Sequence, residues 1–219
     1  MTADEVEECW QLLRQSLPAV SYETLAPPPT YSQWLSRQDW IKPDQRHRKN
    51  LQLIGLNDAD KRWVLKNPSH LFALHALMAA YPDALVVQCH RPVETIMASM
   101  CSLAQHTTEG WSNSFTGDLI GRDAMETWSR GLELFTAERA KHDSAQFYDM
   151  DYFELIKDPV GTVEGIYRHF GIELTDEARA AMQASDAESK QGPRAPKHTS
   201  SLEDYGLTAE SVKDRFKGL

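Results

Sequence analysis

Apolar and polar positions change along the chain in a way that predicts short buried strands separated by helices. The runs 62–66 (RWVLK), 84–89 (ALVVQC) and 145–150 (AQFYDM) are largely apolar and bounded by polar or turn residues, which is typical of buried strands. Between them, the apolar segment 70–81 and the amphipathic segment 124–141 predict helices. Strands that alternate with helices in this way predict an α/β fold, with a parallel sheet flanked by helices.

The rest of the chain predicts helices and loops without further strands. Residues 3–16 place apolar side chains on one helical face, and 31–55 is rich in aromatic and basic residues and partly helical. Towards the C-terminus we expect helices over 160–170, 175–189 and 208–217, and loops over 107–122 and 190–201. No internal repeat is visible, so one domain over 1–219 is expected.

Composition and charge exclude several classes of protein. The 219 residues carry a formal net charge of −9, which argues against non-specific nucleic-acid binding because that needs a basic surface. The three cysteines have no metal-like spacing and favour a reducing compartment. The acidic start is unlike a signal peptide, and no apolar run reaches the length of a membrane span. We therefore expect a cytoplasmic protein.

Two of the predicted strands end in residues that can bind an anion or move a proton. Lys66 ends the first run and His70 follows it, whereas Arg91 follows the second run and Ser99 lies in a helix predicted over 92–105. Ligands of open parallel sheets bind beyond the carboxyl ends of the strands. A cation there, beside a helix N-terminus, favours an anion, and the planar guanidinium matches phosphate oxygens.

Each of these residues also has a structural interpretation. His70 could cap or begin the helix over 70–81, Lys66 could be an exposed strand-end lysine, and Arg91 could be an ion-pair partner. His70 and His75 are five apart, which is wrong for two ligands on one helix face, so no metal site is predicted.

The basic loop over 190–201 adds two further candidates. Arg194 and Lys197 could close over the same anion, although loop charges are more often solvated.

Four segments together resemble the PAPS-dependent sulfotransferases, in particular their bacterial branch with W-V-L-K-x-P-x-H and H-R-D-P patterns. They are RWVLKNPSHL, PDALVVQCHRPVETIMASMCSL, FYDMDYFELIKDPVGTVEGIYRHFGIEL and HTSSLEDYGLTAESVKDRF, in the family's order and spacing. The resemblance implies a P-loop-kinase-like sulfotransferase fold, with a core at 60–217 and a helical acceptor-side region at 1–59.

The resemblance also implies roles for the candidate residues. Arg91 and Ser99 would hold the 3′-phosphate of PAPS, and Arg194 and Lys197 would clamp it from the other side. His70 would be the catalytic base and Lys66 would stabilise charge on the sulfuryl group. No metal is implied.

The sequence departs from the family pattern in three places. Pro92 directly follows Arg91, where the family has Asp, and Ser200 stands where Tyr is common. The glycine-rich loop G-x-x-(K/R)-(S/T)-G-T-T, which wraps the 5′-phosphosulfate in the family, is absent from these 219 residues. We therefore expect an N-terminally incomplete fold: a fragment, the product of a mis-assigned start, or a pseudoenzyme.

The expected reaction moves a sulfuryl group from PAPS to a hydroxyl or amine of a small-molecule or glycolipid acceptor, with PAP as product. A non-catalytic PAP-binding or interaction remnant and a kinase-like nucleotide-dependent transferase are the alternatives. The acceptor and the oligomeric state stay open at this point. The most informative ligands to compare are PAP and ATP.

Overall fold

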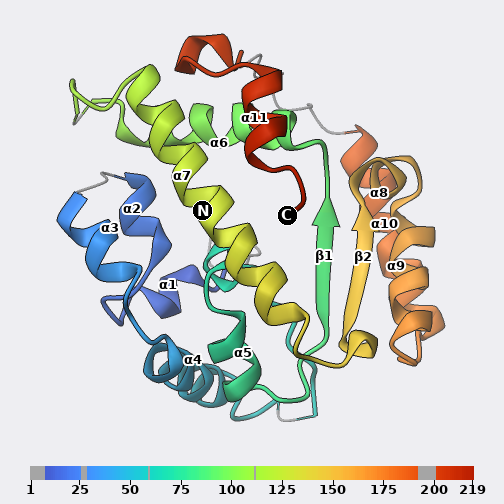
Figure 1. The fold of residues 1–219 in the computed structure, drawn as a ribbon. Helices are drawn as coiled ribbons and strands as arrows, with labels where there is room; N and C mark the ends of the chain where they lie inside the picture. Colours follow the sequence, from blue (N-terminus) through green and yellow to red (C-terminus); the bar gives the residue numbers. More distant parts are fainter. Residues whose placement is uncertain (1–7, 26–28, 59, 111, 192–200) are drawn as a thin grey trace.

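The structure is a computed structural model that describes residues 8–25, 29–58, 60–110, 112–191 and 201–219. Its N-terminal third is helical, and two parallel strands follow with helices between and after them (Figure 1). The elements of this first part are α1 (Trp10–Leu13), α2 (Val20–Leu25), α3 (Pro29–Leu35), α4 (Ile41–Ile54), η1 (Pro68–Leu71) and α5 (Leu74–Ala80). The second part comprises β1 (Val86–His90), α6 (Val93–Thr108), α7 (Asp118–Arg139), η2 (Ser144–Gln146), β2 (Phe147–Asp151), α8 (Tyr152–Lys157), α9 (Pro159–His169), α10 (Asp176–Gln191), η3 (Glu203–Tyr205) and α11 (Ala209–Arg215).

The predicted α/β fold with a parallel sheet flanked by helices is confirmed. Strand β1 pairs with β2 in parallel, in a register that sets Val86 opposite Phe147 and His90 opposite Asp151. Figure 1 shows α8, α9 and α10 beside β2, and α7 on the other side of β1. Both strands therefore end at the same edge of the sheet, which is where the sequence placed its anion-binding residues.

The predicted strand over 62–66 is wrong. Residues 62–67 have no regular secondary structure, and Trp63 and Val64 are 48% and 91% exposed. A strand exists only if its backbone groups pair with a neighbour, and in the described part of the chain β1 pairs with β2 alone. Apolar content alone does not supply a pairing partner.

The predicted burial of the strands on both faces is also wrong for β1. Val87 is 40% exposed, and Cys89 and His90 are exposed as well. The expectation holds better for β2, where Phe147 is buried against Phe135 of α7 and Leu74 of α5. Helices α8 to α10 flank β2 and leave part of β1 open.

The apolar segment 70–81 forms two helices rather than one. The 3-10 helix η1 ends at Leu71, and α5 begins at Leu74 after Ala73, whose φ of −138° and ψ of 35° are not helical. Asn67 caps η1, because its side-chain oxygen accepts a hydrogen bond of 2.9 Å from the backbone N–H of Ser69. This break places His70 on the short η1 helix.

Other helices agree with the sequence apart from their ends. The long α7 begins at Asp118, so the loop before it is shorter than the predicted 107–122. Thr175 precedes α10 and accepts a 3.2 Å hydrogen bond from Ala178 N–H, as its predicted capping role requires. Helix α8 was not predicted, and the Asp151 carboxylate caps it.

Apolar clusters join the N-terminal helices to the rest of the chain. Leu35 and Trp40 pack with Phe72 and Ala76, and Trp128 of α7 contacts this cluster. A second cluster joins α6, α7 and α11, with Val212 fully buried in it. Within the described ranges, no helix combines the length and apolar content that crossing a lipid bilayer requires.

Candidate active site

Arg91 lies where the sequence predicted a cation, directly after β1 and before α6. Its guanidinium stacks 4.5 Å from the centre of the Tyr152 ring, and its Nε atom is buried without a hydrogen-bond partner. In the part of the chain that the structure describes, no carboxylate forms an ion pair with Arg91. An aromatic face holds the guanidinium in place but leaves its charge uncompensated, so an anion can still bind it.

Ser99 lies in the second turn of α6, and its side chain is exposed. Glu94, in the first turn of the same helix, would repel an anion. Lys213 of α11 lies 3.3 Å from the Glu94 carboxylate and compensates this charge. The start of α6 is therefore compatible with an anion near Arg91 and Ser99.

His90, one residue before Arg91, holds the two strands together. Its Nε2 atom lies 2.6 Å from Oδ1 of Asp149, and Arg139 of α7 donates two 2.7 Å hydrogen bonds to the same carboxylate. These donors hold the pKa of Asp149 far below its usual range. The interactions fix the end of β1, and with it the backbone from which Arg91 projects.

Lys66 is exposed but not free. Its ammonium group pairs with the Glu8 carboxylate, which precedes α1. The backbone N–H of Cys9 donates a 3.2 Å hydrogen bond to the Lys66 carbonyl. The segment before α1 therefore lies over the end of the 62–67 stretch, a contact that the sequence did not predict.

His70 is held between the Cys9 thiol and a buried polar cluster. Its Nε2 atom lies 3.7 Å from Cys9 Sγ, and its Nδ1 atom is buried without a partner. Burial and the neighbouring His47 lower the pKa of His70 to about 4. The imidazole is thus neutral near pH 7, which is the form that a general base requires.

Sequence reasoning missed the groups behind His70. The rings of His47 and His70 meet edge to face with centroids 6.0 Å apart, and His47 Nδ1 lies 2.7 Å from the Tyr81 hydroxyl. Asp44, one turn before His47 in α4, is fully buried, and burial raises the pKa of its carboxyl to about 7. The signal that could have found them is their spacing, because 44, 47 and 51 share the buried face of α4.

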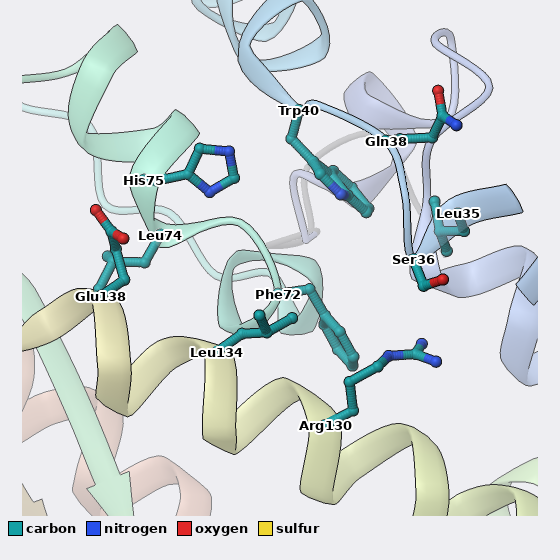
Figure 2. Close-up of a pocket in the computed structure, with 10 residues that line it drawn as sticks. All are labelled: Leu35, Ser36, Gln38, Trp40, Phe72, Leu74, His75, Arg130, Leu134 and Glu138. Carbon is teal, nitrogen blue, oxygen red and sulfur yellow. The ribbon is translucent and has the colours of Figure 1, made fainter. Parts of the chain in front are cut away.

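A cavity of about 140 Å³ opens between the N-terminal helices and α7 (Figure 2). Figure 2 shows the Trp40 ring extending into it from the start of α4, with Phe72 and Arg130 opposite. Its lining residues are Leu35, Ser36, Gln38, Trp40, Phe72, Leu74, His75, Arg130, Leu134 and Glu138. Five of these residues are apolar or aromatic, and five are polar or charged.

The structure brings two of the predicted residues to one contact, because Lys66 and His70 both lie against Cys9. Arg91 directly follows β1, and Ser99 lies in the second turn of α6. Arg194 and Lys197 lie outside the described residues. Among the residues that are described, no three His, Cys, Asp or Glu side chains form a cluster that could hold a metal ion.

Comparison with known proteins gives a consistent result. The model of a family described as "Sulfotransferase family" matches residues 1–176. Omega-hydroxy-beta-dihydromenaquinone-9 sulfotransferase Stf3 of Mycobacterium tuberculosis is 26% identical over 122 residues, which are 51% of this chain and 29% of that protein. The Stf3 protein of Mycobacterium bovis matches equally well.

Two crystal structures share the fold. Sulfotransferase STF1 from Mycobacterium tuberculosis H37Rv superimposes with a TM-score of 0.91 at 70% identity, over 100% of this chain and 56% of that one. Sulfotransferase STF9 from Mycobacterium avium superimposes with a TM-score of 0.87 at 27% identity, over 98% of this chain and 55% of that one. The chain thus spans about half the length of the solved structures that it matches.

Proposed function

The chain belongs to the sulfotransferase family, and on this basis we propose that it acts in moving a sulfuryl group from PAPS to a hydroxyl or amine of a small-molecule or glycolipid acceptor, with PAP as product. The activity is a proposal for this chain because it spans about half the length of its solved relatives. The curated relatives are named for a lipid-like acceptor with a terminal hydroxyl, which supports an acceptor of this class. The three cysteines are free thiols, which supports a cytoplasmic site of action.

The observation that carries the proposal is the state of Arg91. It is a partly buried guanidinium at the carboxyl end of a parallel strand, stacked on Tyr152 and unpaired with any carboxylate in the described residues. Such a group is costly to leave uncompensated unless an anion binds it. The 3′-phosphate of PAPS is the anion that the family resemblance supplies, with Ser99 as a second hydrogen-bond donor.

The chemistry that we propose is an in-line displacement. The acceptor oxygen forms a bond to sulfur while the bond from sulfur to the phosphate oxygen of PAPS breaks, and the electron pair leaves with PAP. The acceptor proton moves to the neutral imidazole of His70, and Lys66 stabilises charge on the sulfuryl oxygens. For Lys66 to do so, its ion pair with Glu8 must open.

The helical region at 1–59 is proposed as the acceptor side. It contributes Leu35, Gln38 and Trp40 to the cavity of Figure 2, and Phe72 lines the same cavity two residues after His70. The apolar rings would hold the body of the acceptor.

A non-catalytic PAP-binding role is the second candidate. It is favoured by the contacts of both proposed catalytic groups, because Glu8 pairs with Lys66 and Cys9 lies against His70. This role requires the Arg91 and Ser99 site but no turnover.

The test is calorimetry of the full chain with PAP and, separately, with ATP. Arg91→Met removes the charge but keeps the stem, and should weaken PAP binding about tenfold to a hundredfold, the equivalent of one charge-assisted hydrogen-bonding group. Ser99→Ala should weaken it several-fold. Arg122→Met is the control, because Arg122 is exposed on α7 and pairs with Asp123.

Unchanged PAP affinity in both site variants, or equal affinity for PAP and ATP, would contradict the assignment. If PAP binds as expected, turnover with PAPS and hydroxylated acceptors distinguishes the enzyme from the non-catalytic form.

A further inference from the structure

The described chain gathers unpartnered buried polar atoms behind His70. They are both carboxyl oxygens of Asp44, Nε2 of His47, Nδ2 of Asn67 and Nδ1 of His70. Buried polar atoms without hydrogen bonds are rare in native proteins, and a group of them points to a function or to internal water. The Cys9 thiol contacts the other ring nitrogen of His70, Nε2, at 3.7 Å.

The geometry links these atoms through His47. Asp44 and His47 are three residues apart on α4 and therefore neighbours on one helix face. The Tyr81 hydroxyl occupies His47 Nδ1 at 2.7 Å, which leaves Nε2 for the interior. The edge-to-face contact at 6.0 Å places the His70 ring beside it.

Among the residues that the structure describes, no cation forms an ion pair with Asp44. The Lys66 ammonium is held by Glu8, and Arg48 lies 6.0 Å from the centre of the Tyr81 ring. The Cys9 thiol faces the cluster from the start of α1, and burial raises its pKa, so it stays neutral. His47 and His70, together with the Asn67 amide, supply the nitrogen atoms of the cluster that lack a hydrogen-bond partner.

We propose that Asp44 is a positioning residue for His70: internal water links its two carboxyl oxygens to His47 Nε2–H and His70 Nδ1–H, which donate to that water and have no direct hydrogen-bond partner among the described residues. Tyr81 fixes His47 by donating to Nδ1. This arrangement holds His70 in the Nδ1–H tautomer and turns the lone pair of Nε2 towards the Cys9 thiol, which lies 3.7 Å away and must move aside before an acceptor can approach. The catalytic role of this arrangement rests on the proposed function, whereas the tautomer of His70 can be tested without it.

The arrangement accounts for the proton in the proposed reaction. A proton from the acceptor hydroxyl arrives at His70 Nε2, and the imidazolium that forms is stabilised by the Asp44 carboxylate on the Nδ1 side. Without that carboxylate, the buried imidazolium would have no compensating charge in the cluster.

The test is side-chain ¹⁵N NMR of the histidines in the full chain at about pH 8, where Asp44 is ionised. We expect His70 in the Nδ1–H tautomer in the wild-type chain and a change of its ring shifts in Asp44→Asn. The control is Asp39→Asn, because Asp39 lies 3.8 Å from His75, which should respond while His47 and His70 do not. Unchanged His70 shifts in folded Asp44→Asn would overturn the proposal.

A second variant covers the case in which Asp44→Asn does not fold. Tyr81→Phe removes the hydroxyl that donates to His47 Nδ1. It should change the ¹⁵N chemical shifts of His47 directly, and those of His70 indirectly, through the Asp44 carboxyl that both rings share. If only His47 responds, the proposed link between the two histidines is wrong.

An activity measurement separates this inference from the proposed function. With PAPS and a competent acceptor, Asp44→Asn should lower kcat at least tenfold with little change in KM, whereas Asp58→Asn, in the exposed turn after α4, should not. Wild-type activity with an unchanged kcat and pH profile in Asp44→Asn would overturn the positioning role. No activity in the wild type, together with the expected NMR response, would contradict the proposed function and leave the hydrogen-bond arrangement standing.

Discussion

The substitution Asp44→Asn should change how the stability of the protein depends on pH. Asp44 is fully buried, and burial raises its pKa from 3.8 to about 7. A carboxyl whose folded pKa lies above its unfolded pKa destabilises the fold as pH rises between those two values, because the native state must give up a proton that it holds more tightly. Over about three pH units this loss amounts to about 4 kcal/mol.

His70 opposes this effect in the wild-type chain. Its pKa falls from 6.5 to about 4, so the fold gains stability as pH rises between these values, by about 3 kcal/mol. The two groups largely cancel from about pH 4 to pH 6.5. Asparagine at position 44 cannot ionise and leaves the His70 contribution uncompensated.

The assay is urea unfolding of the wild type and Asp44→Asn at about pH 5 and about pH 8. We expect the variant to gain stability relative to the wild type by about 3 kcal/mol on going from the lower to the higher pH, which is two pH units of the Asp44 titration at 1.36 kcal/mol each. Exposed Asp39→Asn should show no such change. Parallel curves for the wild type and Asp44→Asn would refute the argument, because they would mean that the native carboxyl titrates near its ordinary pKa.

Three further substitutions test the fold around the site. Gly121→Ala should destabilise the protein by about 3 kcal/mol in denaturant unfolding, because a Cβ on Gly121 of α7 would lie 2.0 Å from the Tyr205 carbonyl oxygen. A loss of stability below about 1 kcal/mol would contradict this close packing. Glu23→Gln should lower the free energy of unfolding by about 3 kcal/mol, because Arg130 donates two hydrogen bonds to the buried Glu23 carboxylate and would lose its counter-charge. An unchanged free energy of unfolding would show that this ion pair does not stabilise the fold. Thr208→Ala should lower the thermal midpoint by the equivalent of about 1 kcal/mol, because it removes the capping box of α11, and Thr208→Ser should restore it.

The sequence predicted β1 and β2 to within about two residues, because both are apolar runs bounded by turn signals. It failed at 62–66, which has the same apolar character but no strand beside it in the described chain. Local pattern determines whether a segment is extended, whereas strand pairing depends on residues far away in the sequence. The break between η1 and α5 was missed for a related reason, since the run 70–81 is apolar apart from two histidines and contains no proline or glycine.

The same distinction separates the predicted part of the candidate site from the missed part. Arg91 and Ser99 follow from the strand-end rule and stay predictions for ligand binding. The contacts of Glu8 with Lys66 and of Cys9 with His70 join residues more than fifty positions apart, and no local pattern indicates them. Asp44 is polar and lies at the start of a helix, where an acidic residue is ordinary, so its burial only emerges from the packing of α4.

The net charge of −9 makes the environment of Arg91 the deciding feature for an anionic ligand. Several other cations near the sheet and its helices are already compensated, in the pairs Arg130–Glu23, Arg139–Asp149, Lys213–Glu94 and Arg215–Glu133. Arg91 contacts an aromatic ring instead, which restricts its motion without neutralising it. A guanidinium that is both fixed and uncompensated can attract a phosphate against the field of an acidic protein, and a lysine there would lose both the stacking and the planar fork. Arg91→Lys should therefore bind PAP almost as weakly as Arg91→Met, and a lysine that restored full affinity would show that charge alone is sufficient.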